Sequence, residues 1–101
     1  MDKKKEDYIE RIKELIQVLK EYDLIQQFGN TVSQNDINRL ILSLQFNLEK
    51  IDNEEEYKRI LRKLGERDQN NKVNIKSVIS DLENVIRKSI GVSYESNSSS
   101  S

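Results

Sequence analysis

The sequence predicts an all-α protein, built as a single four-helix domain with a disordered, serine-rich C-terminal tail. Apolar residues recur three and four positions apart in four separate segments, which is the period of an amphipathic helix. Residues typical of helix ends bound each segment. The chain has 101 residues, which is enough for one core and too few for two. We therefore expect one domain over residues 1–92 and a tail over residues 93–101.

The first helix is expected from about Lys4 to Tyr22. A break follows at residues 28–30, a Phe-Gly-Asn sequence, because Gly and Asn tolerate a positive φ. The apolar residues of this helix form one continuous stripe that would face the core. The stripe consists of Tyr8, Ile9, Ile12, Leu15, Ile16, Leu19 and Tyr22.

The second helix is expected from about Gln34 to Lys50. Ser33 can cap its N-terminus, and Asp36 three positions later completes a pattern that resembles a capping box. Leu42 and Phe46 fall on the side of this helix that is opposite to its core stripe, one turn apart. The core stripe consists of Ile37, Leu40, Ile41, Leu44, Leu48 and Ile51.

The third helix is expected to start at Asn53 and to last about three turns. The three glutamates at positions 54–56 would then lie at the positive end of its dipole, and Gly65 would end it. After a polar loop, the fourth helix is expected from about Ile75 to Ile90. The core stripe of the third helix consists of Tyr57, Ile60, Leu61 and Leu64. That of the fourth helix consists of Ile75, Val78, Ile79, Leu82, Val85 and Ile86.

The composition argues against several functional classes. Seventeen basic and eighteen acidic residues give a net charge of −1, so no overall field attracts the chain to nucleic acid. The absence of Cys and His removes thiol chemistry and the most common general base, so an enzyme is not expected. Apolar runs are only a few residues long, which argues against membrane insertion and a signal peptide. A cytoplasmic location follows as the default.

The two loops before the second and fourth helices end in the same way. Each ends in a valine, Val32 or Val73, followed by a small capping residue, with an apolar helix residue five positions after the valine. Over roughly residues 8 to 90, this spacing resembles the EF-hand family, in particular a single two-motif lobe of the calmodulin and myosin light chain kind. The resemblance implies two paired helix-loop-helix units, joined through the Val32 and Val73 segments.

The second loop departs from the pattern that calcium requires. Glu66, Asp68 and Asn70 stand at its first, third and fifth positions, and Asn71 at the sixth, where a positive φ is needed. Ser77 stands at the twelfth position, where the family has a bidentate glutamate. We therefore expect neither this loop nor the first one to bind calcium, and we expect no cofactor.

The resemblance implies a non-catalytic, calcium-independent light chain or adaptor, which would bind an amphipathic helix of a larger protein such as a myosin. The candidate partner-binding residues are Leu42, Phe46, Tyr8 and Tyr22. Two alternatives remain open at this point. Leu42 and Phe46 could instead be buried against a neighbouring helix of the same bundle. The chain could also be a structural subunit that self-associates or joins a hetero-oligomeric helical bundle.

Overall fold

The computed structural model describes residues 4–91, and the tail predicted for residues 93–101 lies outside them. The described part of the chain contains four helices and no strand, so the predicted all-α class is confirmed. The helices are α1 (Lys5–Gln27), α2 (Gln34–Ile51), α3 (Tyr57–Leu64) and α4 (Ile75–Ser89).

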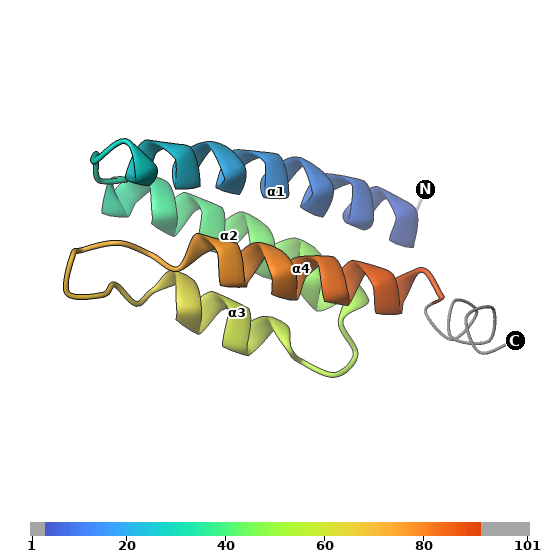
Figure 1. Cartoon of the computed structure of the whole chain (residues 1–101). Coiled ribbons are helices and arrows are strands. Elements are labelled where there is room, and N and C mark those ends of the chain that lie inside the picture. Colours follow the sequence, from blue (N-terminus) through green and yellow to red (C-terminus); the bar gives the residue numbers. More distant parts are fainter. Residues whose placement is uncertain (1–3, 92–101) are drawn as a thin grey trace, which may run out of the picture.

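The four helices run side by side and alternate in direction (Figure 1). The α1–α2 and α3–α4 connections lie at the same end of the bundle, and the α2–α3 connection lies at the other end. α1 packs against α2 and α4, and α3 packs against the same two helices. Each helix therefore has two neighbours and one outward side, as in an up-down-up-down bundle.

The core lies between the four helices and is made of the predicted stripes. Every predicted stripe residue is either buried or partly buried against the core. Ile12, Leu19, Ile37, Leu44 and Leu48 are among the side chains with no exposed surface. Burial of each such aliphatic side chain contributes about 1.5–3 kcal/mol to folding. The helical period of the sequence thus identifies the residues that hold the bundle together.

α1 is longer than the sequence predicts. It continues beyond Tyr22 to Gln27, and Gly29 follows with a φ of +90°. The extra turn is held by Gln26, whose side chain is 3% exposed and bonds to the backbone of Val73. The prediction that the helix ends near Tyr22 was wrong. The contact between Gln26 and Val73 joins residues far apart in the sequence, so the local sequence pattern does not indicate it.

α3 is shorter than the sequence predicts. It begins at Tyr57 instead of Asn53 and has 8 residues. The Asp52 side chain accepts hydrogen bonds from the backbone N–H groups of Glu54 (3.1 Å) and Tyr57 (2.6 Å), and Glu55 has a φ of +58°. Because these bonds fix a turn over residues 52–57, the three glutamates precede the helix and do not form its first turn.

The predicted N-caps of α2 and α4 are confirmed. The Ser33 hydroxyl accepts a hydrogen bond from the Asp36 N–H at 3.1 Å, and the Asn74 side chain accepts one from the Ser77 N–H at 3.3 Å. The Asp36 carboxylate lies 3.5 Å from the Arg39 guanidinium and does not complete the predicted capping box. Each cap bond stabilises its helix by about 1 kcal/mol.

Candidate functional site

Leu42 and Phe46 lie on the outward side of α2. Their exposed fractions are 67% and 54%, whereas Leu44 between them has none. They are one helical turn apart, so their side chains are neighbours on one surface. The alternative in which another helix of the bundle buries them is wrong, because more than half of each side chain stays exposed.

Phe46 is supported on one side and open on the other. Its ring lies 6.3 Å from the ring of Tyr8 on α1, centroid to centroid, with the planes tilted by 57°. The ammonium group of Lys50 lies 5.5 Å from the centroid of the Phe46 ring. Both are favourable geometries for an aromatic ring. They hold the ring in place without covering it, which leaves a preorganised apolar surface.

Tyr22 lies away from Tyr8 and the apolar pair. It lies fourteen residues after Tyr8, which is about 21 Å along the α1 axis at 1.5 Å per residue. There it lines a groove of about 220 Å³ between α1 and α2, together with Asp36 and Arg39. Burial raises the pKa of the Tyr22 hydroxyl above its ordinary value, and the Asp36 carboxylate adds to this shift. Of the four predicted residues, Phe46 therefore contacts Tyr8 and lies one turn from Leu42, whereas Tyr22 lies further along the bundle, beside Arg39.

Two charged residues extend the outward side of α2 beyond the apolar pair. Arg39 lies one turn before Leu42, and Glu49 lies one turn after Phe46. The Arg39 side chain is 79% exposed. Glu49 is exposed and accepts a hydrogen bond from Gln45 at 3.3 Å. We call the stripe formed by Arg39, Leu42, Phe46 and Glu49 the α2 outer stripe.

A second exposed apolar group lies at the C-terminal end of α1. Leu24, Ile25 and Phe28 are 51%, 38% and 81% exposed. These residues are not among the predicted site residues, because the helix predicted from the sequence ends at Tyr22. The four-residue spacing of Leu24 and Phe28 is a helical signal that could have identified them.

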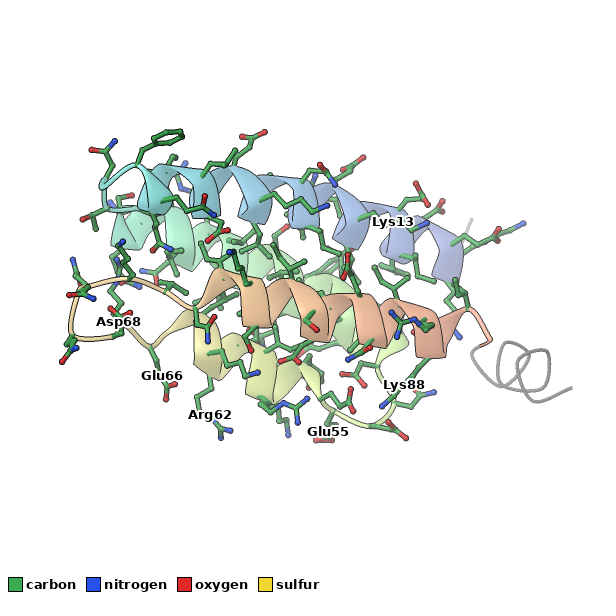
Figure 2. All side chains as sticks on the ribbon, in the orientation of Figure 1. Lys13, Glu55, Arg62, Glu66, Asp68 and Lys88 are labelled. Carbon is green, nitrogen blue, oxygen red and sulfur yellow. The ribbon has the colours of Figure 1, made fainter. Side chains whose placement is uncertain are left out.

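In the loop that resembles a calcium loop, the Asp68 side chain is hydrogen-bonded to the backbone of the loop itself. Asp68 accepts hydrogen bonds through Oδ1 from the N–H groups of Asn70 (2.8 Å) and Lys72 (3.0 Å). Asn71 has a φ of +63°, as its position predicts. Glu66 points away from the bundle into solvent (Figure 2). Within residues 4–91, no three Asp or Glu side chains converge into a group that could hold a metal ion.

The two predicted loop segments are linked through side chains. Val32 and Val73 are both 3% exposed. The Gln26 side chain donates to the Val73 carbonyl at 3.0 Å and accepts from the Val73 N–H at 2.9 Å. The Arg67 guanidinium donates to the Val32 carbonyl at 2.9 Å. The loops are therefore adjacent at one end of the bundle, with side chains satisfying the backbone groups of both valines.

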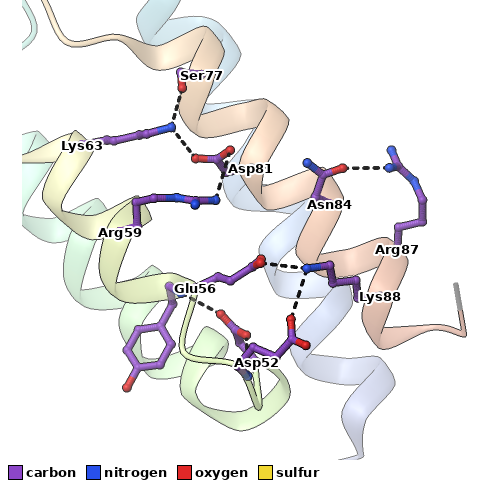
Figure 3. Close-up of polar contacts among 11 residues, drawn as sticks. Asp52, Glu56, Arg59, Lys63, Ser77, Asp81, Asn84, Arg87 and Lys88 are labelled. Carbon is purple, nitrogen blue, oxygen red and sulfur yellow. Dashed lines mark hydrogen bonds and ion pairs between the residues drawn. The ribbon is translucent and has the colours of Figure 1, made fainter.

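Two of the four basic side chains of α3 fasten α3 to α4. Lys63 donates to the Ser77 hydroxyl and the Asp81 carboxylate, both at 2.7 Å, and the Arg59 guanidinium lies 3.9 Å from the same carboxylate (Figure 3). Asp81 is only 14% exposed, so this pair is shielded from solvent more than a typical surface ion pair. The positions of Lys63 and Arg59 are therefore accounted for by the packing of α3 against α4.

A cleft of about 550 Å³ lies at the loop end of the bundle. Its lining carries charges of both signs, including Asp23, Lys63 and Arg67. Gln26, a buried polar side chain of the lining, uses both of its polar atoms in hydrogen bonds to the backbone of Val73. Among the described residues, no unsatisfied buried polar atom lines this cleft to orient a substrate. The α2 outer stripe is therefore the stronger candidate site.

No protein-family model matches the chain, and comparison with curated proteins and with solved structures likewise gives no match. Over residues 4–91, none of the helices combines the length and the apolar character that crossing a lipid bilayer requires. The function must therefore be argued from the surface of the bundle.

Proposed function

We propose that this chain is a non-catalytic, calcium-independent adaptor that binds an amphipathic helix of a protein partner along the α2 outer stripe. The observation that carries the proposal is the exposure of Leu42 and Phe46, at 67% and 54%. The core is complete without them, so they are not needed to fold the bundle. Neighbouring exposed apolar side chains on a helix are typical of helix-binding surfaces.

The geometry around Phe46 supports a binding role for this surface. The contacts with Tyr8 and Lys50 restrict its ring, so little side-chain entropy would be lost when a partner covers it. Aromatic side chains that are fixed in advance commonly carry much of the energy of an interface. The resemblance to light-chain lobes supports a helix as the element that is bound.

The loop geometry supports independence from calcium. Asp68 stands at the third position of the candidate loop, and one of its carboxylate oxygens already accepts hydrogen bonds from two backbone N–H groups. Calcium requires six to eight oxygen ligands. Ser77, which stands at the position of the essential glutamate, instead accepts a hydrogen bond from Lys63.

A second candidate function is favoured by the charges of the α2 outer stripe. Arg39 and Glu49 have opposite signs and stand at equal sequence distances from the centre of the apolar pair. Such an arrangement suits a structural subunit that associates with its own kind.

Photo-crosslinking tests the proposed function. A benzophenone amino acid replaces Leu42 in one variant and Ser80, an exposed residue of α4, in a matched control. Both are expressed in the cells of origin, and crosslinked products are identified by mass spectrometry in the presence and absence of a calcium chelator.

We expect a discrete protein product from position 42 that is absent from position 80, is unchanged by the chelator and is lost when Phe46→Asp is added. Absence of any product from position 42 would contradict the proposal. A product that forms only with calcium would contradict its calcium-independent part.

A further inference from the structure

We propose that the helix bound by the α2 outer stripe is the α2 helix of a second copy, packed antiparallel to the first about a two-fold axis at the level of Leu44. This inference rests on the proposed function in one respect, that the α2 outer stripe is a protein-binding surface. It goes further by naming the partner and the register of the contact.

The α2 outer stripe has the spacing of a helix-pairing seam. Arg39, Leu42, Phe46 and Glu49 are separated by three, four and three residues, which are the alternating steps of a heptad seam. At 3.6 residues per turn they lie on one side of α2. The core-facing residues Leu40, Leu44 and Leu48 lie on the other side and are at most 4% exposed.

The stripe is complementary to itself only when the two helices run in opposite directions. An antiparallel partner centred on Leu44 places Leu42 of one copy opposite Phe46 of the other, and the reverse. The next layer outward on each side then places Arg39 of one copy opposite Glu49 of the other. Two apolar contacts are thus flanked by two pairs of opposite charges, all related by the two-fold axis.

A parallel arrangement of the same two helices does not give this match. In register, Arg39 of one copy would face Arg39 of the other, and Glu49 would face Glu49. Both contacts bring like charges together, which disfavours that orientation. The pattern of charges therefore selects the antiparallel dimer.

The charged groups that the dimer uses are accessible. Arg39 is 79% exposed and touches Asp36 only at 3.5 Å, and Glu49 is held by a neutral donor, Gln45, at 3.3 Å. α2 carries two acidic and two basic residues, so two copies meet without net repulsion. Lys50, the remaining basic residue, lies against the Phe46 ring.

The size of the seam predicts a weak dimer. A standard protein–protein interface removes about 1,600 Å² of surface from solvent in total. Contact through one side of a single helix from each copy buries less than this. Association is therefore expected to depend strongly on protein concentration. The apolar group of Leu24, Ile25 and Phe28 belongs to α1 and lies outside this seam.

Sedimentation velocity over a concentration series tests the proposal with two charge reversals. Arg39→Glu and Glu49→Arg are each measured alone and as an equimolar mixture, beside the unmodified chain. Lys76→Glu, a reversal at an exposed position of α4, serves as the matched control. Circular dichroism confirms that each variant keeps its helix content.

We expect the unmodified chain and Lys76→Glu to dimerise equally. Each α2 reversal alone should weaken dimerisation about tenfold or more, because it places like charges together at two symmetric positions. The mixture should restore association as a heterodimer, because one chain then presents two acids and the other presents two bases. The single reversals separate the two orientations, because a parallel pair has like charges at both positions before and after each reversal and should not be weakened. Weakening by each reversal alone, followed by rescue in the mixture, is therefore expected only of the antiparallel pairing.

Three results would overturn the proposal: an unmodified chain that stays monomeric at all concentrations, single reversals that dimerise normally, or a mixture that does not associate. The crosslink from position 42 separates this failure from that of the proposed function. A monomeric chain that crosslinks to a different protein overturns only the self-pairing. A monomeric chain that gives no crosslink contradicts both.

Discussion

Gln26 and Val73 are joined by two hydrogen bonds between a side chain and a backbone. The Gln26 amide group donates to the Val73 carbonyl at 3.0 Å, and its oxygen accepts from the Val73 N–H at 2.9 Å. Both residues are 3% exposed. The pair fastens the end of α1 to the start of the last helical segment, 47 residues further along the chain.

Replacing Gln26 by Leu, a side chain of similar volume, should therefore lower the free energy of unfolding by more than the small change in volume suggests. The substitution leaves the Val73 N–H buried without a partner, which costs about 1–3 kcal/mol, whereas the Val73 carbonyl keeps the hydrogen bond that it accepts from the Ile75 N–H at 2.8 Å. We expect a loss of about 1–3 kcal/mol in the free energy of unfolding, measured by urea denaturation. Gln27→Leu, at an exposed neighbouring position, should change it by less than about 0.5 kcal/mol. Equal effects at the two positions would refute the role of Gln26.

Replacing Asn47 by Leu should stabilise the bundle. Asn47 is 3% exposed, its Nδ2 donates to the Ser43 carbonyl at 2.7 Å, and no described residue donates to its Oδ1. Removing this unsatisfied acceptor should raise the free energy of unfolding by about 1 kcal/mol, which corresponds to a rise in Tm of about 4–8 °C. Asn38→Leu, at an exposed position on the same helix, should not raise the free energy of unfolding or the Tm. A lower Tm for Asn47→Leu would show that the Asn47 amide is satisfied in solution.

Stability should fall at alkaline pH partly because of Lys88. Hydrogen bonds from its ammonium group to Glu56 (2.7 Å) and Glu54 (3.2 Å) raise the pKa of Lys88 above its ordinary value of 10.5. The folded state therefore holds this proton more tightly than the unfolded state does. The resulting stabilisation is fully present below pH 10.5 and is lost as the pH rises through the higher pKa of the folded protein.

Lys88→Gln should remove this part of the alkaline loss, so that its Tm declines less steeply than that of the unmodified chain above about pH 10. The difference in Tm between the two chains at neutral pH should shrink in high salt, because both partners are near solvent. Arg87→Gln, whose side chain bonds to Asn84 at 2.8 Å, provides the comparison. Parallel pH profiles for Lys88→Gln and the unmodified chain would contradict the assignment.

The core and the two side-chain caps could be predicted from the sequence because local rules determine them. The three- and four-residue spacing of Leu40, Leu44 and Leu48 is enough to indicate which side of α2 is buried. The capping of α2 by Ser33 needs only the three residues that follow it. The ends of α1 and α3 could not be predicted in this way. One depends on the distant Val73, and the other on Asp52, whose side chain accepts two backbone N–H groups that would otherwise begin the helix.

The candidate site was predictable in part. Helical geometry alone separates Leu42 and Phe46 from the core stripe, and their exposure follows once each helix has only two neighbours. The contact of Phe46 with Tyr8 depends on how α1 packs against α2, which spacing within one helix does not determine. The same limit explains why Tyr22 was grouped with residues from which it is distant.

Phe46 serves at the surface of the bundle and not in its core. Equilibrium unfolding and crosslinking from position 42 should therefore be measured together for Phe46→Asp, with Leu44→Ala as the core comparison. We expect Phe46→Asp to lower the free energy of unfolding by only about 1–2 kcal/mol, through the loss of the ring contacts with Tyr8 and Lys50, while abolishing the crosslink. Leu44→Ala should cost about 2–5 kcal/mol. A loss of several kcal/mol for Phe46→Asp, or a crosslink that survives it, would contradict the account.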